Sequence, residues 1–517
     1  MKELESKLKE YAEYLKEIEH YRTAESLMYW DMTTGMPENV AESRTETMSF
    51  MSLQQHNLLV GAKKQEFIKF FEEHIDDLDL IHKRMLTEMK KEYDKQKIYP
   101  EEFVKEFSLA AAKGQLSWEK AKSEDNFEIF KPDLEKIVEL TKQSIKYRGY
   151  KGNKYNTLLD DYEAGLTVEK LDVVFTELRD GIVEILNKIK NSKVKINNKF
   201  EGKEFPKENQ ERFCIELLNT MGFDFKSGRM DESEHPYTMD MTNKDVRITN
   251  HYYLNDFTSA MFSAIHEGGH AIYEQDIPDS LDGTGINKAA SMAIHESQSR
   301  FYENIIGRSK AFCNYLYKEA KKEFHNQFNH VTKEDFYKII NKVEPSLIRT
   351  EADELTYSLH VIIRYEIEKL LINDKIKVSE LPTVWNEKYK EYLGVEPKSD
   401  KEGVLQDVHW SDGSFGYFPS YALGNLYGAQ MLNKMLKDEP HIYDEISKGN
   451  LNSVHQWLNK NVHVYGNLYD PSDLIKKITG EELKAKYFLK YLDDKYKEIY
   501  KYYISRRYVS SCCIEFR

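Results

Sequence analysis

The sequence predicts a mainly α-helical protein: one large helical domain with a small β-sheet beside a helix that carries two histidines. Over most of the 517 residues, apolar side chains recur every three or four positions with charged residues between them, which is typical of amphipathic helices. Period-two alternation, typical of strands, is confined to residues 193–255. No linker, repeat or low-complexity segment divides the chain. We therefore expect one domain over 1–500, helical to about 190 and carrying the candidate site over about 191–500, and a tail of unassigned role over 501–517.

The composition excludes several classes of partner. The net charge is −14, from 74 basic and 88 acidic residues, which argues against nucleic acid or an anionic membrane. The first residues, Met1–Leu8, are charged, and no apolar run approaches the length of a membrane span. The four cysteines have neither disulfide-framework nor zinc-site spacing. We expect a cytoplasmic protein with no nucleic-acid and no membrane partner.

The N-terminal third predicts a succession of helices. Residues 1–30 place Leu4, Leu8, Tyr11, Leu15 and Ile18 at helical spacing. A turn-rich stretch, Trp30–Pro37, interrupts this pattern, and a second helix is expected to about Leu59. Further helices are expected over 65–97, 101–122, 131–147 and 167–191.

The middle of the chain differs, because residues 193–196 and 245–253 alternate with period two and are rich in β-branched or aromatic residues. We expect both stretches to be short strands. Helices are then expected over 258–275, 287–307, 332–342, 346–372 and 420–437. Asp470 and Pro471 predict the start of a last helix that Gly480 ends.

The helix expected over 258–275 carries the chemistry. His266 and His270 are four residues apart, so on a helix they lie on one face and both can point a ring nitrogen at a single metal ion. Glu267 follows the first histidine and can reach a water molecule at that ion. This is the H-E-x-x-H arrangement of zinc peptidases. A strand just before such a helix can pair its edge with an extended peptide.

The alternative is a chance match on a polar helix, but the surroundings favour a buried site. Apolar residues flank the motif: Met261, Phe262, Ile265 and Ile272. Gly268 and Gly269 each cost roughly 1 kcal/mol in a helix interior relative to alanine. We expect them to provide room for a substrate or for a second helix packed closely against this one.

A catalytic zinc needs a third protein ligand and an open position. Asp276, ten residues after His266, could serve as in an extended motif, but the turn glycine of that motif is Tyr273 here. The preferred candidate is Glu296, at the edge of an apolar face on the next predicted helix, and His295 is its rival. Two other residues could orient an imidazole: Gln298 and Glu303.

The chain resembles the carboxypeptidase Taq family of metallocarboxypeptidases. The resemblance rests on ordered blocks: Trp30-Asp31 with Met36-Pro37, His235-Pro-Tyr237, Asp245–Thr249, His266–His270, His295–Gln298, Ile348–Asp353, Gly403–Trp410 and Phe415–Tyr421. Two departures stand out. Tyr237 replaces a phenylalanine of the family, and the tail after about Tyr500 has no counterpart in it.

The resemblance implies a mostly helical fold with a long groove, a homodimer, and a zinc or cobalt ion with Glu296 as third ligand. It also implies that single residues are removed, with broad specificity, from peptides with a free C-terminus. We expect Glu267 to activate the water and to pass its proton to the leaving amine. The resemblance assigns Arg349 to the terminal carboxylate of the substrate, which a planar guanidinium fits well.

Several alternatives stay open at this point. Arg349 could instead form a helix-surface ion pair with Asp353, four residues on. Tyr421 or His409 could stabilise an oxyanion, and His235 is a further candidate for the substrate pocket. The same scaffold could belong to a metallo-endopeptidase or an aminopeptidase. A non-catalytic helical metal-binding protein is the remaining alternative, although a structural site normally leaves no position open for water.

Overall fold

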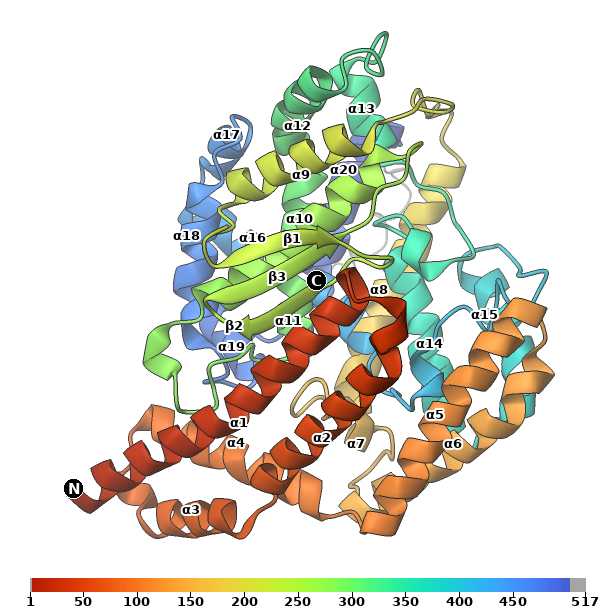
Figure 1. Ribbon diagram of the computed structural model, residues 1–517. Helices are drawn as coiled ribbons and strands as arrows, with labels where there is room; N and C mark the ends of the chain where they lie inside the picture. Colours follow the sequence, from red (N-terminus) through yellow and green to blue (C-terminus); the bar gives the residue numbers. More distant parts are fainter. Residues whose placement is uncertain (1, 503–517) are drawn as a thin grey trace, which may run out of the picture.

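The computed structural model describes residues 2–502, and it confirms the mainly α-helical prediction (Figure 1). The helices of the first half are α1 (Lys2–Thr34), α2 (Ala41–Leu59), α3 (Ala62–Glu73), α4 (Leu80–Lys97), α5 (Glu101–Glu124), α6 (Phe127–Arg148), α7 (Asn156–Leu159), α8 (Val168–Lys190), α9 (Lys207–Met221) and α10 (Phe257–Asp276). Those of the second half are α11 (Met292–Arg300), α12 (Lys310–Glu323), α13 (Lys333–Ile339), α14 (Tyr357–Ile372), α15 (Leu381–Tyr392), α16 (Pro419–Asp438), α17 (Ile442–Ile446), α18 (Asn452–Asn461), α19 (Pro471–Thr479) and α20 (Lys486–Tyr500). None of the described helices is long and apolar enough to cross a bilayer.

Three short strands form one sheet in the order β1-β3-β2: β1 (Gly228–Glu232), β2 (Thr238–Thr242) and β3 (Asp245–Asn250). β3 is parallel to β1 and antiparallel to β2, with Ile248 opposite both Met230 and Thr238. β3 confirms the strand expected from residue 245. Because β3 is the central strand, it leaves no free edge for a peptide, and the expectation of such an edge on this strand was wrong.

The strand expected over residues 193–196 was also wrong. Val194 and Ile196 are half-buried against the main core while their neighbours are exposed, which explains the alternation. The segment nevertheless has no strand beside it among the described residues, so its backbone stays irregular. The alternation here reflects packing of an extended segment on helices and not membership of a sheet.

Helix α10 is buried on nearly all sides and lies behind the sheet in Figure 1. Asp256 begins it, since its Oδ1 accepts hydrogen bonds from Thr258 N at 2.9 Å and Ser259 N at 3.4 Å. A Cβ at Gly269 would lie 2.7 Å from the Gln298 carbonyl oxygen of α11. The glycine is therefore required for α11 to pack closely against α10, which is one of the two roles expected for it.

Some helices differ in length from the prediction. The pattern over 65–97 is two helices, α3 and α4. Residues 346–356 are not α-helical: a 3₁₀ turn covers Arg349–Glu351, and Asp353 then accepts hydrogen bonds from Leu355 N and Thr356 N, both at 3.0 Å. Helix α14 therefore begins at Tyr357, eleven residues later than expected, because such side chains compete with helical hydrogen bonds in the segment before it. Helix α11 likewise begins at Met292, after the Ser291 cap, and continues as a π-helical turn, Phe301–Gly307.

Figure 1 shows α1 running beside β2, with α2 returning along it. The exposed guanidinium of Arg22 on α1 reaches β2, where it donates to Asp240 Oδ2 and to the Met241 carbonyl oxygen, both at 2.9 Å. The start of α1 packs with α3 and α4 around a small second core that includes Tyr11, Phe67 and Phe71. The N-terminal helices thus flank the sheet edge that lies nearest to α10.

Candidate active site

The structure brings His266 and His270 of α10 together with Glu296 of α11. Their potential ligand atoms lie within 4.8 Å of one another. Glu296 Oε2 is 3.7 Å from His266 Nε2 and 3.4 Å from His270 Nε2. Ligand atoms about 2.1 Å from a tetrahedral zinc ion are about 3.4 Å apart, so the spacing of this triad fits a small divalent cation. Three protein ligands would leave one position open.

The two histidines differ in their surroundings: His266 has a carboxylate partner, whereas the pKa of His270 is lowered. His266 Nδ1 is 2.8 Å from Glu303 Oε2, which leaves Nε2 as the nitrogen that faces Glu296. Burial opposes ionisation of Glu303, but Arg300 and His266 lower the pKa of its carboxyl group to about 2. Burial and the neighbouring His295 lower the pKa of His270 to about 3, so that its ring is neutral, as a metal ligand must be. Glu303 therefore lies where an orienting partner was expected.

The other predicted ligands and partners lie outside the triad. His295 stacks on the His270 ring at 4.3 Å, and its Nε2 is 2.9 Å from Glu274 Oε1.

Asp276 faces away from the triad. Its Oδ2 is 2.7 Å from both His455 Nε2 and His463 Nδ1. Gln298 also turns to His463, with 3.0 Å between its Oε1 and His463 Nε2, so it does not orient His266 or His270.

Glu267 lies beside the triad with a buried carboxylate. Thr238 of β2 donates to Glu267 Oε2 at 2.6 Å and to the Glu267 carbonyl oxygen at 3.1 Å. Burial raises the pKa of Glu267. Thr238 was missed at the level of sequence; its place directly after the His235-Pro-Tyr237 block was the only signal. Strand β2 thus fixes one oxygen of the carboxylate through a side chain from another part of the chain.

Arg349 is buried, and it pairs with Asp407 and not with Asp353. Its Nε and Nη2 donate to Asp407 Oδ1 at 3.0 and 2.9 Å. Asp353 instead accepts hydrogen bonds from the backbone amides of Leu355 and Thr356, so the Arg349–Asp353 ion pair was wrong. Burial opposes ionisation of Asp407, but Arg364 and Arg349 hold its pKa far below the usual range. Asp407 was not singled out in the sequence, although it lies inside the 403–410 block.

Tyr421 and His409 lie next to Arg349. The Arg349 guanidinium is 5.0 Å from the Tyr421 ring, and His409 Nε2 is 3.4 Å from the Tyr421 hydroxyl. Burial raises the pKa of Tyr421 and lowers that of His409 to about 4, so both are neutral near pH 7. Tyr357 lies between Arg349 and the triad. Its hydroxyl accepts a hydrogen bond from Arg349 Nη1 at 3.1 Å, and its ring lies 4.3 Å from the guanidinium of Arg300, which pairs with Glu296.

His235 is exposed, and no hydrogen bond among the described residues joins its side chain to the triad. Its neighbour Tyr237 packs edge-on against Trp30 at 5.7 Å, and the Tyr237 hydroxyl contacts Thr33 Oγ1. The hydroxyl that distinguishes this chain from the family pattern therefore contacts helix α1 and not the triad.

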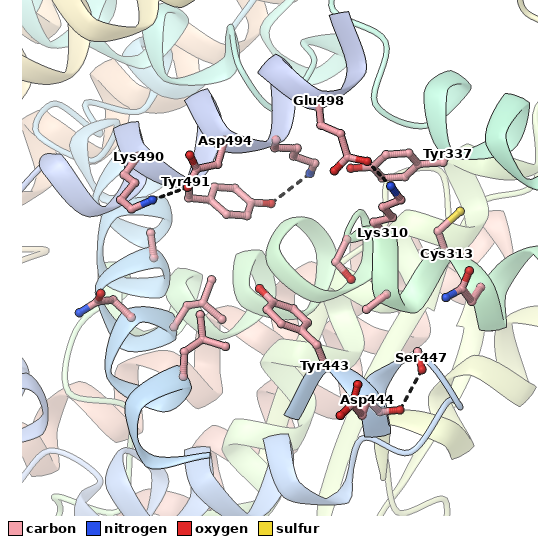
Figure 2. Close-up of a pocket in the computed structure, with 18 of the residues that line it drawn as sticks. Lys310, Cys313, Tyr337, Tyr443, Asp444, Ser447, Lys490, Tyr491, Asp494 and Glu498 are labelled. Carbon is pink, nitrogen blue, oxygen red and sulfur yellow. Dashed lines mark hydrogen bonds and ion pairs between the residues drawn. The ribbon is translucent and has the colours of Figure 1, made fainter. Parts of the chain in front are cut away.

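A cavity of about 750 Å³ lies elsewhere, between α12, α16 and α20 (Figure 2). None of the predicted site residues lines it. Lys310 pairs with Glu498 and Lys490 with Asp494, and Lys495 pairs with the buried Glu354. Because no histidine and none of the predicted metal ligands is among the described residues that line it, this cavity lacks the ligand set expected of the catalytic site.

Comparisons with known proteins agree with the geometry of the triad. The family described as carboxypeptidase Taq (M32) metallopeptidase matches residues 10–496. Carboxypeptidase 1 of Bacillus subtilis is 44% identical over 492 residues, which cover 95% of this chain and 98% of that protein. The structure of a Pyrococcus furiosus carboxypeptidase is 34% identical, with a TM-score of 0.92 over 95% of this chain and 99% of that one. An M32 carboxypeptidase from Deinococcus radiodurans R1 is 33% identical, with a TM-score of 0.93 over 96% of this chain and 100% of that one. The chain belongs to the carboxypeptidase Taq (M32) family and is a metallocarboxypeptidase, a hydrolase of peptides that uses a divalent metal ion.

Proposed function

We propose that this enzyme removes single residues from the free C-terminus of peptides, with His266, His270 and Glu296 holding a zinc ion. Cobalt is the alternative metal. The observation that carries the proposal is the spacing of the three ligand atoms, with a buried carboxylate, Glu267, directly beside them. When bound, the cation supplies a Lewis acid that polarises the carbonyl of the scissile bond and lowers the pKa of a water molecule. Nitrogen and carboxylate donors are those that zinc prefers.

Glu267 acts as general base in this proposal: it takes a proton from the attacking water and delivers it to the leaving amine. Two features support this role. The hydrogen bond from Thr238 occupies Oε2, so Oε1 is the oxygen available to the water. The raised pKa of the buried carboxyl group brings it closer to neutral pH, where a base that must also return its proton works best.

Arg349 binds the terminal carboxylate of the substrate. Of the five N–H donors of a guanidinium, two bond to Asp407 and one to Tyr357, so two are left for a ligand. Asp407 holds the Arg349 guanidinium in one orientation and offsets part of the positive charge of Arg349 and Arg364. We assign stabilisation of the oxyanion to the neutral Tyr421 hydroxyl or the His409 ring, which lie beside Arg349, and we assign His235 to the substrate pocket on the family resemblance alone.

The other proposals rest on the sequence and on the family resemblance: broad specificity, a homodimer, a cytoplasmic location, and one catalytic domain over 1–500. The tail expected over 501–517 lies, from residue 503 on, outside the described residues. Membership of the family favours a carboxypeptidase over the endopeptidase, the aminopeptidase and the non-catalytic metal-binding protein.

A pair of variants tests the metal and base assignments together. Glu267→Gln keeps the size of the side chain but cannot accept the proton, so we expect it to bind one zinc ion per chain like the parent and to lose peptide hydrolysis. His270→Ala removes a ligand, so we expect it to lose zinc as well. Metal content is measured by elemental analysis after dialysis. Parent-like hydrolysis by Glu267→Gln, or parent-like zinc content in His270→Ala, contradicts the corresponding assignment.

A further inference from the structure

Arg300 lies between the carboxylate of Glu296 and the carboxylate that orients His266. It is the last residue of α11, one turn after Glu296, and its Nε donates to Glu296 Oε1 at 2.6 Å. Its Nη1 donates to Glu303 Oε2 at 3.1 Å. The same Glu303 oxygen is 2.8 Å from His266 Nδ1. One guanidinium thus joins two of the three triad residues, one directly and one through Glu303.

The two oxygens of Glu296 have different neighbours. Arg300 occupies Oε1, whereas Oε2 is the oxygen that faces both imidazoles, at 3.7 and 3.4 Å. A carboxylate can bind a metal through one oxygen or through both. A short charge-assisted hydrogen bond to Oε1 orients that oxygen toward Arg300, so Oε2, which accepts the longer hydrogen bond of 3.2 Å from Ser299 Oγ, is the oxygen presented to the metal.

Arg300 is not needed to neutralise Glu303, because Arg308 also pairs with that carboxylate. Arg308 Nη2 is 3.4 Å from Glu303 Oε1, so Glu303 has a second cation of its own. Among the described residues, Arg300 is the only lysine or arginine paired with Glu296. Helix α11 changes to a π-helical turn directly after Arg300, and such turns are frequent at functional sites.

We propose that Arg300 is a positioning residue for the metal: it holds Glu296 so that Oε2 alone is offered as ligand, and it fixes the His266 ring through Glu303. The proposal rests on the ligand set given under the proposed function. Residues that support metal ligands in this way typically contribute about 10- to 100-fold to metal affinity.

The test compares Arg300→Met, Arg300→Lys, Arg308→Met and Arg148→Met. Arg148 pairs with Asp161 at 2.7 Å, in a comparably buried ion pair that contains none of the triad residues. Zinc affinity is measured by competition with a chelator, and the visible absorption of the cobalt-substituted proteins reports the ligand geometry. Circular dichroism of the metal-free proteins monitors folding.

We expect Arg300→Met to bind zinc about 10- to 100-fold more weakly than the parent and to shift the cobalt spectrum. Arg300→Lys keeps the charge but loses the planar fork whose Nε and Nη1 reach the two carboxylates separately, so it should recover part of the affinity and keep a shifted spectrum. Arg308→Met should weaken zinc less than Arg300→Met, and Arg148→Met should match the parent. If Arg300→Met does not fold, the visible spectrum of cobalt-substituted Arg300→Lys tests the proposal in its place.

Parent-like affinity and spectrum in Arg300→Met or, where that variant does not fold, a parent-like spectrum in Arg300→Lys overturns the proposal. A Glu296→Ala variant separates this failure from failure of the ligand set. If Glu296→Ala loses zinc while the Arg300 variants match the parent, only the role of Arg300 is wrong. If Glu296→Ala binds zinc like the parent, the ligand set itself is wrong and the role of Arg300 is overturned with it.

Discussion

The contact between α10 and α11 at Gly269 controls the distance between the histidines and Glu296. In a Gly269→Ala variant, the new methyl group would lie 2.7 Å from the Gln298 carbonyl oxygen and 2.8 Å from Ser299 Cα. Ordinary contact is 3.4–4 Å, and both atoms belong to the backbone, which cannot turn aside as a side chain can. The two helices must therefore separate by roughly 0.7 Å at this point, because packed interiors have no spare volume.

The size of the effect follows from two opposing contributions. Overpacking costs about 1–3 kcal/mol, and replacing a helical glycine by alanine returns roughly 1 kcal/mol, so we expect a net loss of stability of up to about 2 kcal/mol. Metal binding should suffer more. The 3.4 Å between Glu296 Oε2 and His270 Nε2 widens when the helices separate. Disturbing the supporting structure of a metal site weakens metal binding about 10- to 100-fold, and we expect Gly269→Ala in that range.

The neighbouring glycine provides a matched control. A Cβ at Gly268 would meet the ends of flexible side chains of α9: 2.6 Å to Leu218 Cδ2 and 2.9 Å to Met221 Cε. Gly268→Ala should therefore lose some stability but keep the zinc affinity of the parent. Chelator competition gives the affinity, and urea unfolding of the metal-free proteins gives the stability. Equal zinc affinities for Gly268→Ala and Gly269→Ala would refute the reasoning.

Two further predictions concern Arg349 and the buried Glu368. Replacing Arg349 by alanine should lower kcat/KM for peptides with a free C-terminus by about 10- to 100-fold, since a hydrogen bond to a charged group contributes about 1.5–3 kcal/mol, and should leave zinc content unchanged; rates equal to those of the parent would rule out its role. Burial raises the pKa of Glu368 to about 7, from 4.5, despite donors that include Trp410 Nε1 at 2.7 Å. The folded state therefore binds the proton of Glu368 more tightly than the unfolded state does. The stabilisation that results is complete below pH 4.5 and is lost as the pH rises through 7. Urea unfolding at pH 5 and pH 8 should show a smaller loss of stability for Glu368→Gln than for the parent, and equal losses would contradict the assignment.

The parts of the site that the sequence predicts are those encoded locally. His266, Glu267 and His270 are brought together by the period of one helix, so their spacing alone predicts a common face. Strand β3 was predicted because its apolar side chains alternate within six residues. Glu296 required a weaker inference, since it depends on how the next helix returns.

The remaining features depend on contacts between segments far apart in the chain. Thr238 reaches Glu267 from β2, whose sequence Thr-Met-Asp-Met-Thr alternates like a strand but does not show which distant segment its polar side chains face. Arg349 and Asp407 are 58 residues apart, and a local ion pair with Asp353 looked equally good in the sequence. The contacts of Arg300 with Glu296 and Glu303 are local, but their connection to His266 appears only once α10 and α11 are packed together. The error over 193–196 has the opposite origin, because local alternation cannot show that a neighbouring strand is missing.

The most direct test of the proposed reaction maps the cleavage products of one set of peptides. Some peptides are blocked at the N-terminus and others are amidated at the C-terminus, and all are incubated with zinc- or cobalt-loaded enzyme, with Glu267→Gln as control. Mass spectrometry should show stepwise loss of residues from free C-termini only, and no loss with Glu267→Gln. Internal cleavage, loss from the N-terminus, or equal processing of amidated peptides would contradict the assignment of Arg349 and of the end specificity.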